Sequence, residues 1–526
     1  MTENGGQIDR FIHERLPPPD QWPDIIPLPG IFQTGPLNCV EALLDRHISD
    51  AIALTGQNGA WNYSELNAQA CRIANVFTNE LGIVSGNRVL IRGGNSPEVA
   101  VIWLAIQKAG AVAVTTMSLL RAGELSSIMK MARPALALSE TDIADELETA
   151  IVQSGAKCRL VNFEALETLS AHQLPEFETY PTHADDVALL AFTSGTTGKP
   201  KATIHFHRDV VSICEILCTN IIKPTPDDVF IGTSPLAFTF GLGGLLLFPL
   251  YAGASSVLLP RYSPEELLSA IKTYHASLCF TVPTFYQRMA RVARPDDTAS
   301  LRLAISSGET LPLPVRHEWQ GKTGVEMAEL LGSTEMLHAF IGAAGHDIRA
   351  GSIGRALPGY QAQVIDDEGS EMEPGTLGRL AVKGPTGCRY LEDPRQNDYV
   401  QNGWNITGDT CTLDEDGYVS YHARFDDMII SAGYNISATE VENALLTHPD
   451  VAECAVVAAP DTGRGQIVSA FVVAKTPVLN EAAFVKKLQE HVRNLIAPYK
   501  YPRAIKFMGK LPRNESGKIQ RFQLRT

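Results

Sequence analysis

The sequence has no long apolar segment, no closely paired cysteines and no excess of positive charge. Its longest apolar run, around Gly241–Tyr251, is too short and too rich in glycine to cross a bilayer. The nine cysteines include no Cys-x-x-Cys pair, which is typical of reduced thiols rather than of disulfides or a zinc site. The net charge of −15 disfavours nucleic acids and anionic membranes as partners. Because the first residues also lack the apolar core of a signal peptide, we expect a cytoplasmic protein.

Short apolar runs alternate with longer helical patterns through much of the chain. Val89–Ile91 is predicted as a strand and Pro97–Ala109 as the helix that follows it, and Gly110–Thr115 and Ala122–Met131 repeat this pair. Such alternation is typical of α/β folds with largely parallel sheets. The proline-rich segment Leu16–Gly30 should instead be an extended arm that lies on a domain.

The pattern changes from about Tyr360, where short strands are separated by Gly, Asp and Pro turns. A chain of 526 residues is also longer than one hydrophobic core usually serves. We therefore predict an α/β protein with a large N-terminal body over residues 1–424, a hinge over 425–427 and a small C-terminal α/β cap over 428–526. The body combines mainly parallel sheets and helices with a β-rich subdomain.

A loop dense in glycine, hydroxyl and lysine side chains follows the strand-like run Val187–Phe192. Its sequence is Thr193-Ser194-Gly195-Thr196-Thr197-Gly198-Lys199-Pro200-Lys201. The glycines allow a tight turn, while N–H groups, hydroxyls and lysine charges can bind phosphate oxygens. A Walker loop is excluded by its spacing, since Pro200 follows Lys199, so an ordinary kinase or GTPase is disfavoured. A flexible surface turn is the alternative, which this density of residue types disfavours.

This loop resembles, residue for residue, the TSGTTGKPK signature of the adenylate-forming superfamily, which includes acyl-CoA synthetases, luciferases and the adenylation domains of peptide synthetases. The resemblance implies a mobile loop that holds the β- and γ-phosphates of ATP and helps pyrophosphate to leave. It also implies that the cap is mobile and rotates about a hinge between two half-reactions.

Two further segments resemble superfamily motifs on the nucleotide side. Ser307-Gly308-Glu309-Thr310 corresponds to the adenine-side loop. In Leu331-Gly332-Ser333-Thr334-Glu335, the resemblance implies that Thr334 contacts the α-phosphate and that Glu335 holds Mg²⁺, a cation that prefers oxygen ligands. On its own, one Glu in such a turn is more often a helix cap. Leu331 stands where many relatives have an aromatic residue that stacks on adenine, so stacking is expected to be weaker there.

The resemblance continues through the domain break. Gly408-Asp409 and Arg424 match the ribose contacts, and Asp426 matches the hinge residue between body and cap. Ala432-Gly433-Tyr434 is similar to the stretch beside the pantetheine channel, which implies CoA as co-substrate. Near the C-terminus, Leu511–Lys518 resembles the PxxxSGK segment, which implies that Lys518 reaches both the acyl carboxylate and the α-phosphate. A solvated tail lysine is the alternative.

These motifs imply a two-step reaction. The substrate carboxylate attacks the α-phosphate of ATP and expels pyrophosphate, so catalysis depends on positioning and on neutralising charge. Lys518, Lys199, Thr334 and Glu335 are the expected catalytic residues. A thiol then attacks the acyl-adenylate after the cap has rotated.

The acid pocket is expected between two segments of the body. Phe238, Thr239, Phe240 and Gly241 correspond to the superfamily's aromatic gate and pocket wall. The run GSTEMLHAF, which begins at Gly332, resembles the matching run of benzoate- and 2-aminobenzoate-CoA ligases, and the N-terminal Leu16–Pro23 is similar to the 2-aminobenzoate branch. Within this run, His338 either orients a ring substituent or is a structural residue under the Mg²⁺ loop.

The sequence therefore predicts an ATP-dependent aryl-CoA ligase that uses Mg²⁺, CoA and a small aromatic carboxylic acid and releases AMP and pyrophosphate. 2-Aminobenzoate (anthranilate) is the first choice of acid and benzoate the second. One alternative is a stand-alone adenylation enzyme that loads an aryl acid onto a carrier protein. Another is a non-catalytic nucleotide sensor or interaction protein, which is disfavoured because the phosphate loop, Glu335 and Lys518 are all present.

Overall fold

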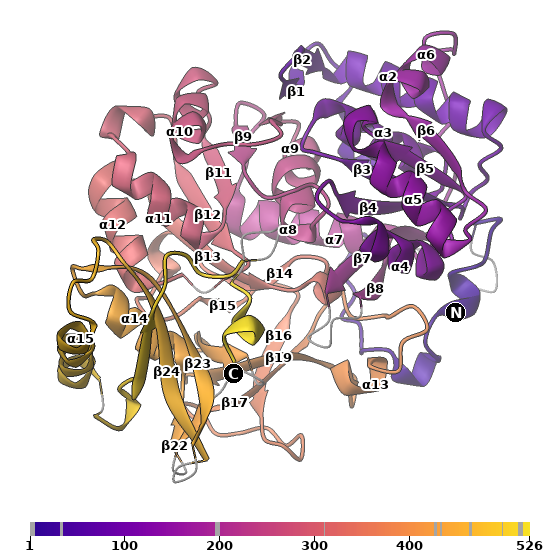
Figure 1. Ribbon diagram of the computed structural model, residues 1–526. Helices are drawn as coiled ribbons and strands as arrows, with labels where there is room; N and C mark the ends of the chain where they lie inside the picture. Colours follow the sequence, from indigo (N-terminus) through magenta and orange to yellow (C-terminus); the bar gives the residue numbers. More distant parts are fainter. Residues whose placement is uncertain are drawn as a thin grey trace.

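A six-stranded sheet forms one half of the N-terminal body in the computed structural model (Figure 1). Its strand order is β6-β5-β3-β4-β7-β8, and all neighbours are parallel except β7 and β8, which form an antiparallel pair. The strands are β3 (Arg88–Gly93), β4 (Val112–Met117), β5 (Leu136–Ser139), β6 (Arg159–Asn162), β7 (Val187–Ser194) and β8 (Pro200–Phe206), and the helices between them are α3 (Pro97–Lys108), α4 (Ala122–Ala132), α5 (Ala144–Ser154) and α6 (Phe163–Ser170).

A nine-stranded sheet forms the other half, in the order β15-β14-β13-β12-β11-β9-β10-β1-β2. The strands from β13 to β1 in this order are parallel, and antiparallel strands lie at both edges. The strands are β1 (Ile52–Gly56), β2 (Gly59–Asn62), β9 (Val229–Gly232), β10 (Ser255–Val257), β11 (Leu278–Thr281), β12 (Leu303–Ser307), β13 (Met327–Gly332), β14 (Ala339–Gly342) and β15 (Arg355–Ala356).

The helices divide the body into layers. Helices α2 (Tyr63–Asn75), α3 and α7 (His207–Leu217) contribute to one core with residues of both sheets, so they lie between the sheets. Helices α10 (Pro264–Thr273), α11 (Pro283–Val292) and α12 (Leu313–Thr323) cover the outer face of the nine-stranded sheet, and α4 and α5 cover the outer face of the six-stranded sheet (Figure 1). Shorter helices are α1 (Cys39–Leu43), α8 (Thr239–Leu242) and α9 (Phe248–Tyr251).

Two smaller sheets complete the chain. An antiparallel sheet contains β16 (Gln361–Ile365), β17 (Gly378–Lys383), β18 (Val400–Gln401), β19 (Trp404–Leu413) and β20 (Val419–Arg424), with α13 (Gln396–Tyr399) beside it. The C-terminal unit contains β21 (Ile429–Ser431), β22 (Tyr434–Ile436), β23 (Val451–Asp461), β24 (Gly465–Ala474) and β25 (Ala504–Phe507), with α14 (Ala438–Leu446) and α15 (Glu481–Leu495). The structure describes residues 6–31, 35–194, 200–309, 311–424, 429–431, 434–461, 465–496, 498–513 and 519–525.

The predicted fold class is confirmed: a large body of sheets and helices, a β-rich subdomain and a small C-terminal α/β unit. The main differences are local. β4 begins at Val112 rather than Gly110, because Gly110 has a positive φ of 67° that ends the turn after α3. The arm Leu16–Gly30 contains one 3-10 turn at Pro19–Gln21. No helix within the described ranges is long and apolar enough to cross a membrane.

Helix starts follow from local chemistry. The Asn62 side chain accepts from the Glu65 N–H, and the Glu65 carboxylate accepts from the Asn62 N–H, so α2 begins with a reciprocal capping box. Ser263 and Glu266 begin α10 in the same way. These caps satisfy backbone donors that a helix leaves unpaired at its start.

A buried aromatic pair fixes the outer helices to the strands that carry the candidate site. The Trp319 ring of α12 is fully buried and packs edge-on against the Tyr286 ring of α11, with centroids 4.9 Å apart. The Tyr286 hydroxyl donates to the Cys279 carbonyl oxygen on β11 at 2.7 Å. This links both helices to the centre of the nine-stranded sheet.

We expect Trp319→Ala to lower the free energy of unfolding by about 3–5 kcal/mol, because it leaves a cavity where a fully buried ring was. Urea unfolding followed by circular dichroism would measure this. The neighbouring Glu318→Ala, at an exposed position on the same helix, should change the free energy by less than about 0.5 kcal/mol. Equal effects of the two substitutions would contradict the prediction.

Candidate active site

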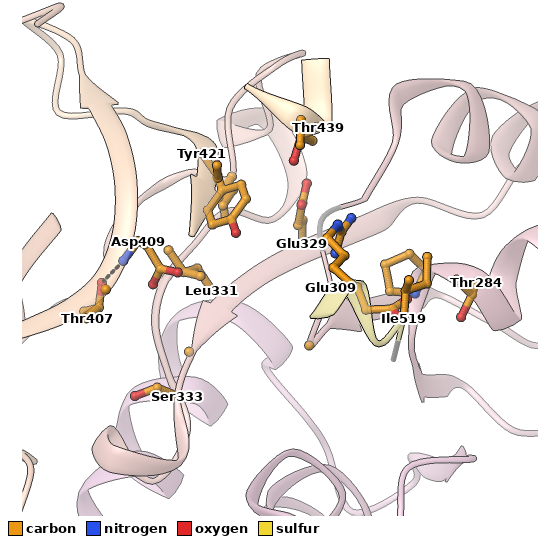
Figure 2. Close-up of a pocket in the computed structure, with 18 of the residues that line it drawn as sticks. Thr284, Glu309, Glu329, Leu331, Ser333, Thr407, Asp409, Tyr421, Thr439 and Ile519 are labelled. Atoms are coloured by element: carbon orange, nitrogen blue, oxygen red, sulfur yellow. Dashed lines mark hydrogen bonds between the residues drawn. The ribbon is translucent and has the colours of Figure 1, made fainter. Parts of the chain in front are cut away.

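One cavity of about 800 Å³ lies where the body meets the C-terminal unit. Its described walls come from the loop after β12, from the end of β13, from β19 and β20, from α14 and from the segment around Leu511–Arg521. Figure 2 shows side chains from these elements pointing toward one space, with Asp409 and Tyr421 on one side and Glu309 and Ile519 on the other. Strands of parallel sheets commonly place ligand-binding loops at their carboxyl ends, which is where the β12 and β13 segments lie.

Many of the residues predicted from sequence line this cavity together. They are Thr193, Gly308, Glu309, Leu331, Gly332, Ser333, Thr334, Glu335 and Asp409. Other predicted residues lie outside the described residues: Gly195, Thr196, Thr197, Gly198, Lys199, Thr310, Asp426, Ala432, Gly433 and Lys518, together with the side chains of Ser194, Arg424 and Tyr434. For Lys518, the described neighbours on each side, Arg513 and Ile519, form a backbone bridge and both line the cavity.

Strands β7 and β8 form an antiparallel hairpin. Thr193 pairs with Lys201 and Ser194 pairs with Pro200 across the two strands. A Walker loop joins a strand to a helix, so the antiparallel pairing of β7 and β8 confirms that this segment is not a Walker loop. The hairpin also brings Lys201 to the wall of the cavity.

Glu335 lies at the wall of the cavity and is 9% exposed. Its Oε1 accepts a hydrogen bond from the Tyr390 hydroxyl at 2.6 Å, and Lys201 Nζ lies 3.8 Å from the same oxygen. Burial, with the Glu335 carboxylate nearby, raises the pKa of Tyr390 far above its ordinary value, so the phenol remains a donor. Nearby, the Ser333 and Tyr399 hydroxyls are hydrogen-bonded at 3.1 Å.

The donor set at Glu335 suits one particular kind of metal site. Within the described part of the chain, no three His, Cys, Asp or Glu side chains lie together as a metal-binding group. A single carboxylate facing a cavity fits Mg²⁺ that arrives on a polyphosphate, because phosphate oxygens and water complete its octahedral shell. Glu335 therefore fits a Mg²⁺ that is bound chiefly by phosphate oxygens, and without a nucleotide the protein would hold such a cation only weakly.

The wall around Leu331 holds three residues that the sequence did not single out. Tyr421 of β20 lies near Leu331 and Asp409 in Figure 2, and Thr407 Oγ1 accepts from the Asp409 N–H at 3.3 Å. Glu329 of β13 accepts from the Leu311 N–H at 3.0 Å and pairs with a guanidinium nitrogen of α12 at 3.1 Å. Burial raises the pKa of Glu329 despite these contacts. No sequence motif marked these positions, because their neighbours in space come from distant segments.

Two of the predicted acid-pocket residues, Phe240 and His338, belong to a separate aromatic cluster. Phe238 caps the start of α8, which contains Thr239, Phe240 and Gly241, and none of these residues or His338 is among the described residues that line the 800 Å³ cavity. The His338 ring lies 5.7 Å from the Phe240 ring and 4.8 Å, edge-on, from the Phe248 ring.

His338 is 3% exposed, and neither ring nitrogen makes a hydrogen bond of good geometry within the described chain. Burial lowers the pKa of His338 to about 4, although a backbone group of Phe240 offsets part of this lowering. The imidazole is therefore neutral at physiological pH, with one N–H donor and one acceptor nitrogen available to a group that enters beside it.

Contacts across the boundary hold the C-terminal unit over the cavity. The Ala452 carbonyl oxygen accepts hydrogen bonds from Gln287 and Arg291 of α11 at 3.3 and 3.0 Å. Arg513 lies 3.9 Å from Glu309 of the body and 2.8 Å from Glu453 of its own unit. In this arrangement the segment that flanks Lys518 faces the cavity.

This fold, with a cavity between a large body and a small C-terminal unit, is that of the adenylate-forming enzymes. The family model described as AMP-binding enzyme matches residues 41–389, and the model described as AMP-binding enzyme C-terminal domain matches residues 440–518. The chain belongs to the AMP-binding enzyme family and to its class of AMP-forming acid–thiol ligases.

Several known proteins are similar along nearly the whole chain. Benzoate–CoA ligase of Thauera aromatica is 33% identical over 486 residues, which cover 89% of this chain and 91% of that protein. The human mitochondrial acyl-coenzyme A synthetase ACSM5 is 32% identical over 502 residues, covering 90% of this chain and 85% of that protein. The crystal structure of the anthranilate CoA ligase AuaEII in complex with anthranoyl-AMP has a TM-score of 0.88 at 30% identity and covers 93% of this chain and 96% of that chain.

Three buried histidines predict acid sensitivity of the body. Burial lowers the pKa values of His205, His207 and His338 to about 4. The unfolded chain binds these protons near the ordinary pKa of about 6.5, so stability is fully present above that pH and is lost as the pH falls toward 4. We expect a loss on the order of 3 kcal/mol per histidine across this window.

Urea unfolding between pH 7 and pH 4 would measure this loss. His338→Phe keeps a ring in the aromatic cluster. It should reduce the number of protons taken up on unfolding in this pH range by about one. His317→Phe, at an exposed position of α12, should leave the pH dependence as it is. The prediction would be contradicted if the free energy of unfolding of His338→Phe fell with decreasing pH as steeply as that of the unchanged protein.

Proposed function

We propose that this protein is an ATP-dependent aryl-CoA ligase, which converts an aromatic carboxylic acid, ATP and CoA into an aryl-CoA thioester, AMP and pyrophosphate. The observation that carries this proposal is the shared cavity, in which the phosphate hairpin, the Thr334-Glu335 turn, Asp409 and the segment flanking Lys518 meet. These segments are far apart in sequence, and a nucleotide with an attacking acid is the ligand whose parts match them all.

The first half-reaction depends on holding two anions together. Asp409 would accept hydrogen bonds from the ribose hydroxyls, with Arg424 beside it, while the loop from Thr193 to Lys199 would hold the β- and γ-phosphates. Thr334 would contact the α-phosphate, and Lys518 would bridge that phosphate and the acid carboxylate. Mg²⁺ held by Glu335 would supply further neutralisation of phosphate charge.

The adenine would lie between the Gly308-Glu309-Thr310 loop and Leu331. Tyr421 offers a ring on the same wall, where the leucine provides no aromatic surface. Glu329 presents a carboxylate that can accept from an exocyclic amine.

The second half-reaction requires a thiol to reach the acyl-adenylate. We propose that the body covers residues 1–424, the hinge 425–427 and the cap 428–526, and that the cap turns about Asp426 to withdraw Lys518. Ala432, Gly433 and Tyr434 would then flank the pantetheine arm of CoA. Among the described residues, Ala452 and Arg513 contact the body through polar groups, and such an interface can open.

The acid is proposed to bind beside Phe238, Phe240 and His338, with 2-aminobenzoate (anthranilate) as the first choice and benzoate as the second. A planar ring gains about 0.5–1.5 kcal/mol from each well-placed aromatic contact beyond its burial. A neutral His338 could accept a hydrogen bond from an ortho amino group or donate to an acceptor on the ring. The similar benzoate–CoA ligase and anthranilate CoA ligase support an aryl acid. The name of the acyl-coenzyme A synthetase relative does not specify an aryl acid, so the test must also exclude an alkyl acid.

An acid panel tests this proposal. AMP release in the presence of CoA should give the highest kcat/KM for 2-aminobenzoate, followed by benzoate, with octanoate at least tenfold lower, which corresponds to about 1.4 kcal/mol. Preference for octanoate would overturn the aryl assignment. Saturation of the rate by free CoA would separate this function from the alternative of a carrier-protein acceptor.

Lys518→Ala should slow the adenylation half-reaction by about 10²–10³-fold, because it removes a charge that stabilises the transition state. Acid-dependent exchange of pyrophosphate into ATP measures this step without CoA. Lys510→Ala, at an exposed lysine of the same C-terminal segment, is the matched control and should retain the exchange rate. A Lys518→Ala variant that exchanges at the normal rate would show that the lysine does not serve this step.

A further inference from the structure

A chain of two hydrogen bonds links Lys201 to the carboxylate that is proposed to hold Mg²⁺. Lys201 Nζ donates to the Tyr390 hydroxyl at 2.8 Å, and this hydroxyl donates to Glu335 Oε1 at 2.6 Å. The ammonium also lies 4.7 Å from the centre of the Tyr390 ring. Tyr390 therefore contacts both charged groups.

The direction of this chain is fixed by the groups themselves. An ammonium has only donors and an ionised carboxylate has only acceptors, so the hydroxyl must accept from Lys201 and donate to Glu335. In this geometry the Lys201 nitrogen stays 3.8 Å from Glu335 Oε1. A direct charge-assisted hydrogen bond would be about 2.7–2.9 Å long, so the hydroxyl satisfies both groups without a tight ion pair.

The Tyr390 ring has little freedom to leave this position. The segment that carries it pairs with β8, where the Leu391 N–H donates to the Ala202 carbonyl oxygen at 2.9 Å. The Tyr390 N–H donates to the Gln396 side chain at 2.8 Å. The ring itself packs edge-on against Tyr399, with centroids 5.9 Å apart. Lys201 and Tyr390 thus share one strand pair, which fixes their separation.

Charge explains why a tyrosine hydroxyl between Lys201 and Glu335 is useful. A carboxylate as buried as that of Glu335 needs a nearby positive charge, which a divalent cation bound with the nucleotide would provide. Lys201 provides it at other times. If lysine and glutamate formed a direct pair, the incoming cation would have to break it, whereas a lysine held on a tyrosine hydroxyl is displaced more readily.

We propose that Lys201 is a placeholder cation at the Mg²⁺ position and that Tyr390 is a positioning residue that keeps this lysine beside Glu335 without a direct ion pair. The inference rests on the proposed function, because it takes Glu335 as the Mg²⁺ ligand. With Mg²⁺ and ATP bound, the Lys201 ammonium would be free to contact the phosphate oxygens, and Mg²⁺ would supply the positive charge beside Glu335.

Mn²⁺ binding without nucleotide, acid or CoA tests this proposal through the electron paramagnetic resonance signal of free Mn²⁺. Lys201→Met should lower the Kd for Mn²⁺ about tenfold, because it removes a competing unit charge close to the carboxylate. Tyr390→Phe should raise the Kd about threefold or more, because the lysine is then free to pair directly with Glu335. A purely structural role for these residues would not give shifts of opposite sign.

Matched variants elsewhere in the chain control for general effects. Lys383→Met removes a half-buried lysine that pairs with Asp24, and Tyr63→Phe removes a buried hydroxyl that donates to the Ala254 carbonyl oxygen. Both should leave Mn²⁺ binding unchanged. Adding Glu335→Gln to Lys201→Met should abolish the gained affinity.

The proposal is overturned if Lys201→Met fails to tighten Mn²⁺ binding, including the case in which neither it nor the unchanged protein binds Mn²⁺ detectably. It is also overturned if Tyr390→Phe shifts the Kd in the same direction. Failure of the proposed function would be seen in a different experiment. In that case the protein would not release AMP in an acid-dependent way, whatever the Mn²⁺ titrations give.

Discussion

Charge balance within one cavity is the constraint on which the rest of this structure depends. The protein carries a net charge of −15, yet its proposed ligands are a triphosphate, an acid and CoA, which are all anions. The cavity wall itself contributes carboxylates from Glu309, Glu329 and Asp409 as well as from Glu335. Favourable binding therefore requires that these carboxylates be engaged by the protein before a ligand arrives.

The contacts around the cavity meet this requirement. An arginine of α12 pairs with Glu329, Arg513 lies near Glu309, and the Tyr390 hydroxyl and Lys201 accompany Glu335. Buried carboxylates left without such partners would cost several kcal/mol each. Because Arg513 belongs to the C-terminal unit, part of this compensation is present only when that unit covers the cavity. The position of the C-terminal unit therefore sets part of the charge balance at the cavity.

The proposed acid pocket follows a different principle. Its aromatic cluster is apolar, and burial keeps His338 neutral, so an uncharged ring can enter without meeting a fixed charge. The carboxylate of the acid would then be the only charged group that must face the phosphates. If the proposed assignment holds, separation of an apolar acid pocket from a charged nucleotide cavity would explain how relatives with benzoate, anthranilate and general acyl names can share one framework.

Local sequence determined the elements and the segments of the site that are continuous in the chain. Apolar spacing placed the ends of α3, α4 and β3 within a residue or two, since burial of one face is encoded by spacing alone. The Thr193–Lys201 loop and the Thr334-Glu335 turn were recognisable because each carries its chemistry within a few residues.

Tertiary structure alone decided which partners those segments meet. Tyr390 lies 189 residues from Lys201 and 55 from Glu335, and no spacing rule connects the three. Glu329 and Tyr421 likewise line the same cavity only because β13 and β20 come from different sheets that face it. Hydrogen bonds and charges act over a few ångströms in space, so their partners are set by how the sheets pack and not by the order of residues along the chain.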